Sequence, residues 1–97
     1  MSFVNRKLIT YDIIVKNKQI RKVDNMKYYQ RIRDIREDSD KKQSDIADYL
    51  KIDTSYYGKY ERGVHPIPTE HIIQLCYYYN LSADYLLGLI DEPRPLK

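Results

Sequence analysis

The stretch from Gln43 to Gly63 constrains the fold more than any other part of the sequence. It holds two short helical patterns of apolar residues, separated by only a few positions: Ile46, Ala47 and Leu50 form the first, and Tyr57 and Tyr60 the second. Two helices joined so closely must cross at a steep angle, and they cannot bury their apolar faces alone. In such a pair the second helix can project from the protein surface, which is the geometry that fits a helix into the major groove of DNA. The stretch therefore predicts a helix-turn-helix.

The residues at the turn agree with this prediction. Ala47 is small where the first helix must approach the second closely, and Ile52 is apolar inside the turn. Asp53 is a suitable N-cap for a helix that begins at Thr54.

Several motifs in register with this turn resemble the Cro and phage-repressor family, also called xenobiotic-response-element-like regulators. They are Arg36 in the first helix, Gln43 in the second, the Tyr-Glu-Arg-Gly ending at positions 60 to 63 and the closing Asp-Tyr-Leu-Leu-Gly at 84 to 88. The resemblance covers about residues 29 to 88. It implies an all-α, five-helix, lambda-repressor-like DNA-binding domain.

The resemblance also implies a function. The expected protein is a sequence-specific, double-stranded DNA-binding transcriptional regulator, a repressor that acts as a homodimer on an inverted repeat. The alternative is a protein-interaction module on the same fold, such as an antitoxin, in which DNA contact is secondary. A recognition helix that is free and has basic surroundings would favour the first function, and a shielded one the second.

Length and charge limit the other possibilities. Ninety-seven residues fit one domain, with no room for a separate sensor domain. The net charge of +3 is uneven, because residues 1 to 25 carry six Lys or Arg against two Asp, and residues 26 to 97 carry eleven against twelve Asp or Glu. A near-neutral domain neither supports nor excludes DNA binding, since a local basic face matters more than the total charge.

Cysteine and histidine usage argues against several classes of site. The single cysteine, Cys76, cannot form an internal disulfide, and no apolar run is long enough for a membrane span or signal peptide, so we expect a cytoplasmic protein. Cys76, His65 and His71 lack metal-ligand spacing, and Cys76 is expected in the core. No catalytic trio stands out. We therefore expect no enzyme activity, metal, cofactor or small-molecule ligand.

The chain divides into an N-terminal extension at 1–25, the helix-turn-helix domain at 26–90 and a C-terminal tail at 91–97. In the extension, apolar residues at 9, 11, 13 and 15 alternate as in a strand, and residues 20 to 23 can return as a second strand. This pattern leaves two alternatives, a small β-hairpin and a poorly ordered arm.

Five helices are expected in the domain: 28 to 38, 43 to 50, 54 to 62, one capped by Thr69, and 83 to 87 capped by Ser82. In the first, Arg31 is expected largely off the apolar face. Lys42 stands where the family usually has a capping Ser or Thr, and Asp40 with Gln43 can form a capping box instead. Lys51 stands where the family prefers Gly, at a modest cost in stability if its φ is positive.

The third helix is expected to read DNA. If Tyr57 and Tyr60 face inward, the residues that point largely the other way meet base edges, as the resemblance implies; these are Thr54, Ser55, Gly58 and Lys59. Side chains at the nearby helix ends are expected to contact DNA phosphates, namely Lys42, Gln43, Tyr56, Arg62 and His65.

Two further sets of residues have expected roles. The resemblance implies that Arg36 pairs with Glu61 and so holds the recognition helix on the scaffold. Helix five and the residues after it contain more apolar side chains than so short a segment can bury, so Leu86, Leu89 and Ile90 are candidates for a dimer interface. The edge of the hairpin, if it forms, is a rival interface. Tyr77, Tyr78 and Tyr79 span too wide an arc to stack bases in a row, and one or two of them are expected in the core.

Overall fold

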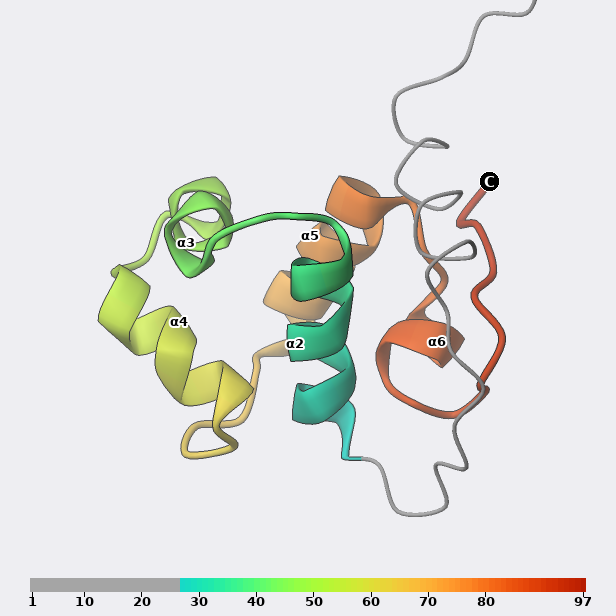
Figure 1. Ribbon diagram of the computed structural model, residues 1–97, viewed down its shortest axis with the longest axis horizontal. Coiled ribbons are helices and arrows are strands. Elements are labelled where there is room, and N and C mark those ends of the chain that lie inside the picture. The colour runs from blue at the N-terminus through green and yellow to red at the C-terminus, as the bar shows by residue number, and fades with distance from the viewer. Residues whose placement is uncertain (1–26) are drawn as a thin grey trace, which may run out of the picture.

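The computed structural model describes residues 27–97, and the expected hairpin lies outside these residues. The described part is helical, as predicted, and forms no sheet. Its five helices are α2 (Tyr28–Asp38), α3 (Gln43–Leu50), α4 (Thr54–Glu61), α5 (Thr69–Tyr79) and α6 (Ala83–Leu86) (Figure 1).

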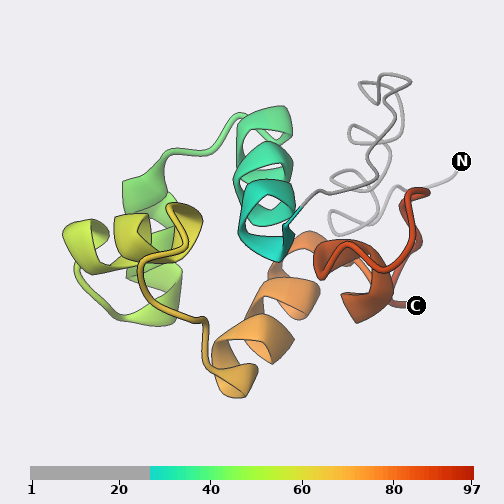
Figure 2. The same cartoon turned by 90° about the horizontal axis from the view of Figure 1, so that it is seen from below.

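Helix α2 is the central element of the domain. Figure 1 shows the α3–α4 pair on one side of α2, and α6 with the C-terminal segment on the other. Seen from below, α5 lies on a third side of α2 and runs at an angle to it (Figure 2). The α3–α4 pair therefore forms one side of the domain and packs against α2 through α4.

The core forms where these helices meet. Tyrosine supplies much of its volume, because Tyr57, Tyr60 and Tyr79 are all buried. Their neighbours in the core come from every helix and include Ile32, Ile35, Ile46, Leu50, Leu75 and Leu86. Of the three consecutive tyrosines in α5, Tyr79 is buried, Tyr78 is half-buried and Tyr77 is exposed, as the predicted arc requires. Cys76 is buried in the core as expected.

The predicted bounds of α2 and α3 are confirmed, but the predicted start signal of α3 is wrong. Asp40 lies before the helix with a φ of 58°, outside helical geometry. Lys42 is the N-cap, and its backbone N–H donates to the Asp45 carboxylate at 2.9 Å. The acidic third residue of the helix thus satisfies the backbone N–H of the N-cap, as the third helical residue does in a capping box.

The predicted cap of α5 is also wrong. Thr69 is the first helical residue, and Pro68 is the N-cap. The carbonyl of Pro68 accepts hydrogen bonds from the backbone N–H of His71 and Ile72, at 3.0 and 3.1 Å. The helix begins one residue early because proline, with no N–H of its own, presents an extended backbone that leads directly into the first turn.

Two backbone positions shape the helix-turn-helix. Lys51 ends α3 with a φ of 62°, so a lysine occupies a left-handed conformation that suits glycine. Gly63 follows α4 with a φ of 74°, and a Cβ placed on it would lie 2.6 Å from the Tyr29 ring. Gly63 is therefore required both by its backbone angle and by the close approach of α2.

The segment predicted as a tail packs back on the domain. Leu81 and Pro95 form an antiparallel bridge. The backbone N–H of Ser82 donates to the Arg94 carbonyl at 2.8 Å, and that of Leu96 donates to the Asn80 carbonyl at 3.2 Å. Residues 91–97 thus lie beside residues 80–82, which connect α5 to α6. None of the helices in the described part combines the length and apolarity that a transmembrane span needs.

Candidate nucleic-acid interface

Helix α4 has one buried and one exposed side. Tyr57 and Tyr60 are buried, as predicted from their spacing, and so is Glu61. Thr54 and Ser55 are exposed in its first turn. The helix is therefore anchored by two aromatic rings and a carboxylate, while its N-terminal turn stays free for contact with another molecule.

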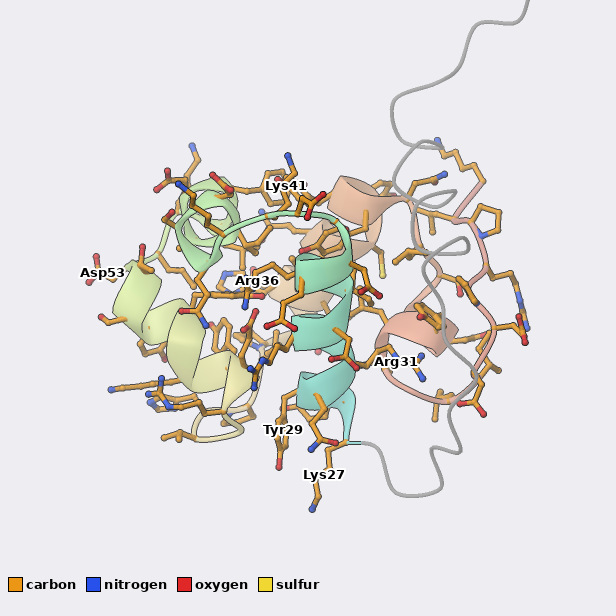
Figure 3. The ribbon with its side chains drawn as sticks, in the orientation of Figure 1. Lys27, Tyr29, Arg31, Arg36, Lys41 and Asp53 are labelled. Atoms are coloured by element: carbon orange, nitrogen blue, oxygen red, sulfur yellow. The ribbon has the colours of Figure 1, made fainter. Side chains whose placement is uncertain are left out.

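Arg36 and Glu61 form the predicted pair. Arg36 Nε donates to Glu61 Oε2 at 2.7 Å, and a terminal nitrogen of Arg36 donates to Glu61 Oε1 at 3.0 Å. The two side chains are only 12% and 2% exposed. In Figure 3, Arg36 extends from α2 toward the α3–α4 pair. The planar guanidinium thus joins the central helix to α4 by two parallel hydrogen bonds.

Gln43 extends this network to α3. Its side-chain Nε2 donates to Glu61 Oε1 at 3.0 Å. Arg36 also donates to the Lys41 carbonyl at 2.9 Å, in the loop before α3. The Glu61 carboxylate therefore joins α4 to α2 and to the first residue of α3, and Arg36 joins the loop to the same network.

The network shifts the pKa values of both charged partners. Burial alone would raise the pKa of Glu61. The hydrogen bonds and positive charge of Arg36, together with polar neighbours that include Gln43, lower it, and the pKa lies below the ordinary value of 4.5. The hydrogen bond to Glu61 raises the pKa of Arg36 against the opposing effect of burial. Both groups are therefore charged in the folded protein over the physiological pH range.

The residues expected to contact phosphate lie before α3, within the first turn of α4 and after the end of α4. Lys42, Tyr56 and Arg62 are exposed, and His65 is half-buried. The ring of His65 lies 5.0 Å from that of Tyr56, centre to centre. These side chains are thus gathered at the starts and ends of α3 and α4, where the sequence places them.

Gly58 does not lie on the exposed side of α4 as predicted, and Gln43, which begins α3 as predicted, has a contact within the domain. Gly58 is buried: a Cβ placed on it would lie 3.2 Å from the Arg62 guanidinium and 3.4 Å from the Gln43 side-chain oxygen. Gly58 therefore faces α3 and not open solvent. Gln43 has its amide nitrogen engaged with Glu61, so its side chain is part of the scaffold. Lys59, by contrast, is half-buried, and its ammonium group is on a side chain long enough to reach beyond the helix surface.

The expected dimer candidates divide in the same way. Leu86 is 0% exposed in the core of its own domain, so the prediction that it faces a partner is wrong. Ile90 is partly buried against the same core. Leu89 is 74% exposed. The short helix α6 buries more than expected because α2, α5 and residues 91–97 all lie around it.

Arg31 is a structural residue that the sequence prediction misplaced. It is buried on α2, where its guanidinium donates to the carbonyls of Tyr85 at 2.7 Å and Ile90 at 3.1 Å. It also lies 4.1 Å above the Tyr85 ring and 3.5 Å from the Asp91 carboxylate. In Figure 3, Arg31 and Arg36 leave α2 toward opposite sides. Residues 28, 31, 32 and 35 have the spacing of one helix face, which indicated that Arg31 lies on the buried side of α2. Its charge led instead to the prediction that it lies off that face.

These features define the class as a helix-turn-helix domain, and comparison with known proteins agrees. Residues 29–92 match the family model described as a helix-turn-helix domain, so the chain belongs to the helix-turn-helix family. The chain is similar to the uncharacterized HTH-type transcriptional regulator YobD of Bacillus subtilis (strain 168), with 35% identity over 68 residues. The match covers 70% of this chain and 61% of that protein, so the chain spans less than two thirds of its relative's length. No solved structure matches the chain.

Proposed function

We propose that this protein is a sequence-specific, double-stranded DNA-binding transcriptional regulator, a repressor that acts as a homodimer on an inverted repeat. The observation that carries the proposal is the fixed and exposed α4: Thr54 and Ser55 are open to solvent, while the Arg36–Glu61 pair anchors the same helix. The similarity to a transcriptional regulator supports the regulatory role. The resemblance to Cro and phage repressors supports repression.

The side chains on the free side of α4 suit base recognition. The hydroxyls of Thr54 and Ser55 can donate to or accept from base edges in the major groove. Lys59 can donate to the O6 and N7 acceptors of guanine. Because Gly58 faces α3, direct readout would fall on these three residues, all of which lie on one short helix.

Phosphate contacts would orient the helix in the groove. Lys42 and Arg62 are exposed cations, and Tyr56 is an exposed residue with a hydroxyl group. The first turn of α3 supplies backbone N–H groups at the positive end of its helix dipole. These groups carry no sequence information, but they fix the position from which α4 reads the bases.

A homodimer is proposed because one such helix reads few bases. Two copies related by a two-fold axis would double the readout on half-sites roughly 34 Å apart. Leu89 supports an interface on the α6 side of the domain, since it is exposed while its backbone N–H is held by the Asp84 carbonyl at 2.8 Å. An apolar side chain displayed on a fixed backbone is suited to a subunit contact.

A protein-interaction module such as an antitoxin is the alternative. That function would be favoured if another part of the protein shielded α4. The exposure of Thr54, Ser55 and Arg62 favours DNA as the partner, and the neighbouring cations Lys42 and Lys59 agree with it.

Selection from a pool of random duplexes tests the proposal. The full chain should enrich one inverted-repeat sequence, and fluorescence anisotropy should then give a higher affinity for that duplex than for a shuffled duplex of the same composition. Enrichment of a single half-site would refute the homodimer alone. Failure to enrich any sequence, with no binding to duplex DNA at low salt, would refute the proposed function.

A further inference from the structure

Gly58 stands at a position where the backbone does not need glycine. It lies inside α4, and the glycines with a positive φ are Gly63 and Gly88. Glycine within a helix destabilises it relative to alanine, because the unfolded chain loses more conformational freedom on folding. A reason for glycine here must therefore come from what lies beside its Cα.

Two polar side chains fill the space where a Cβ would project. The nearest atom is a terminal nitrogen of Arg62, 3.2 Å from the Cβ position, and the next is the side-chain oxygen of Gln43, 3.4 Å away. The first distance is shorter than normal contact, so any side chain at position 58 must displace at least the guanidinium. We call this space, bounded by Gly58, Gln43 and Arg62, the Gly58 slot.

A hydrogen bond to Glu61 fixes the orientation of the Gln43 amide in the slot. Its Nε2 donates to Glu61, which is itself paired with Arg36. A carboxylate only accepts hydrogen bonds, so the amide must turn its nitrogen toward Glu61 and its oxygen toward the slot. A fixed acceptor thus faces the place where the Arg62 guanidinium lies.

The slot therefore determines where the Arg62 charge lies. Arg62 is an exposed residue just after α4, and a free arginine in that position would sample many rotamers. Because position 58 itself has no side chain, the Arg62 guanidinium can lie against α4 beside Gln43, the first residue of α3. This places the charge beside the side chain of the residue with which α3 begins.

We propose that Gly58 is a positioning residue for DNA binding, which leaves the slot open so that Arg62 meets a DNA phosphate beside the N-terminus of α3. The proposal rests on the proposed function, since it assumes that α4 enters the major groove. Gly58 itself contributes no DNA contact. Its role is to keep Arg62 and Gln43 against the helix.

The test compares Gly58→Ala, Gly58→Leu, Arg62→Ala and the double variant Gly58→Leu with Arg62→Ala in the full chain. Gln74→Leu on α5 is the matched control, because it adds a leucine to a helix without changing charge. Binding is measured by anisotropy on a duplex of unrelated sequence over a range of salt concentrations, and thermal unfolding is followed in parallel. This probe needs no knowledge of an operator.

Arg62→Ala and Gly58→Leu should each weaken binding roughly tenfold near 0.1 M salt. Each should also make the negative slope of log affinity against log salt shallower by about one. The double variant should bind no more weakly than either single variant, because both remove one phosphate contact. Gly58→Ala should unfold at a higher temperature than the wild type and yet bind slightly less well, since only the tip of Arg62 must move. A general loss of structure would lower both quantities together.

Three results would overturn the proposal. They are full affinity in a folded Gly58→Leu variant, a loss of affinity with an unchanged salt slope, and a double variant whose loss is the product of the single losses. A wild-type protein that binds no duplex would instead refute the proposed function, so the two failures can be told apart. If Gly58→Leu does not fold, opposite changes in stability and affinity in Gly58→Ala still support the proposal, and parallel changes refute it.

Discussion

Removing Arg36 should destabilise the protein strongly, because it leaves a buried carboxylate without its cation. Glu61 is 2% exposed and Arg36 12% exposed, so water can replace little of the lost interaction. Breaking a buried pair by removing one partner costs roughly 3–5 kcal/mol. Gln43 still donates to Glu61 in the variant, which places the expected loss for Arg36→Ala near the lower end, at about 3 kcal/mol.

The loss should depend on pH in a defined direction. In the wild type the pKa of Glu61 lies below 4.5, so its stabilising contribution is complete above about pH 4.5 and disappears as the pH falls through the folded-state pKa. In Arg36→Ala, burial without the cation raises the pKa of Glu61. As the pH falls, Glu61 is protonated, and the destabilisation caused by a buried charge without a cation disappears. The free-energy difference between the two proteins should therefore shrink on acidification.

Urea unfolding followed by circular dichroism, at neutral pH and below pH 4.5, measures this difference. Arg33→Ala is the matched control on the same helix, because Arg33 pairs with Glu37 at 3.2 Å in an exposed position. The control should change stability by less than about 1 kcal/mol. A loss in Arg36→Ala as small as in the control, or one that stays constant between the two pH values, would refute this account of the pair.

Arg36→Ala should also weaken DNA binding in the fraction that remains folded, since Arg36 joins α2 to α4 through Glu61. Full affinity in the folded variant would show that the pair stabilises the domain without setting the recognition helix.

Three other substitutions test separate parts of the structure. Lys51→Gly should stabilise the protein by about 1 kcal/mol, because Lys51 has a φ of 62°; an unchanged urea midpoint would contradict this. Lys59→Ala should lose on the order of 1–3 kcal/mol on the selected duplex and relax the preference at one base pair, whereas an equal loss on all sequences would make Lys59 a phosphate contact. Leu89→Asp should give a folded monomer in sedimentation experiments, with nonspecific DNA binding retained; a persistent dimer would place the interface away from the α6 side.

The sequence predicted the helices well because local signals specify them. The bounds of α2 and α3 follow from apolar periodicity, and the burial of Tyr57 and Tyr60 follows from their spacing of three. The pairing of Arg36 with Glu61 was available only through the family resemblance, since the residues are far apart in sequence. Local periodicity and family motifs thus determined most of the helix-turn-helix.

The predictions that failed depend on contacts between distant segments. Leu86 was assigned to a partner because the predicted helix at 83 to 87 and the residues after it have more apolar side chains than so short a segment can bury, yet α2 and residues 91–97 pack around α6 and Leu86 is buried. Arg31 was placed on the polar side because of its charge, although it donates to two carbonyls some 50–60 positions away. The carbonyl partners of Arg31 and the α2 residues beside α6 are far away in the sequence, so periodicity could indicate that Arg31 shares the buried face but not which groups it meets.

Arg31 and Arg36 together explain how one short helix can organise the domain. Arg36 reaches the carboxylate of α4, and Arg31 reaches the backbone that follows α6 (Figure 3). One arginine thus ties α2 to the proposed DNA-reading side, and the other ties it to the side that exposes Leu89. In a two-fold dimer formed through the Leu89 side, the separation of the two recognition helices depends on how α4 is placed relative to that side within each subunit. Because both ties leave the same helix, a rigid α2 would hold that separation constant, and a loosened tie on either side would broaden it.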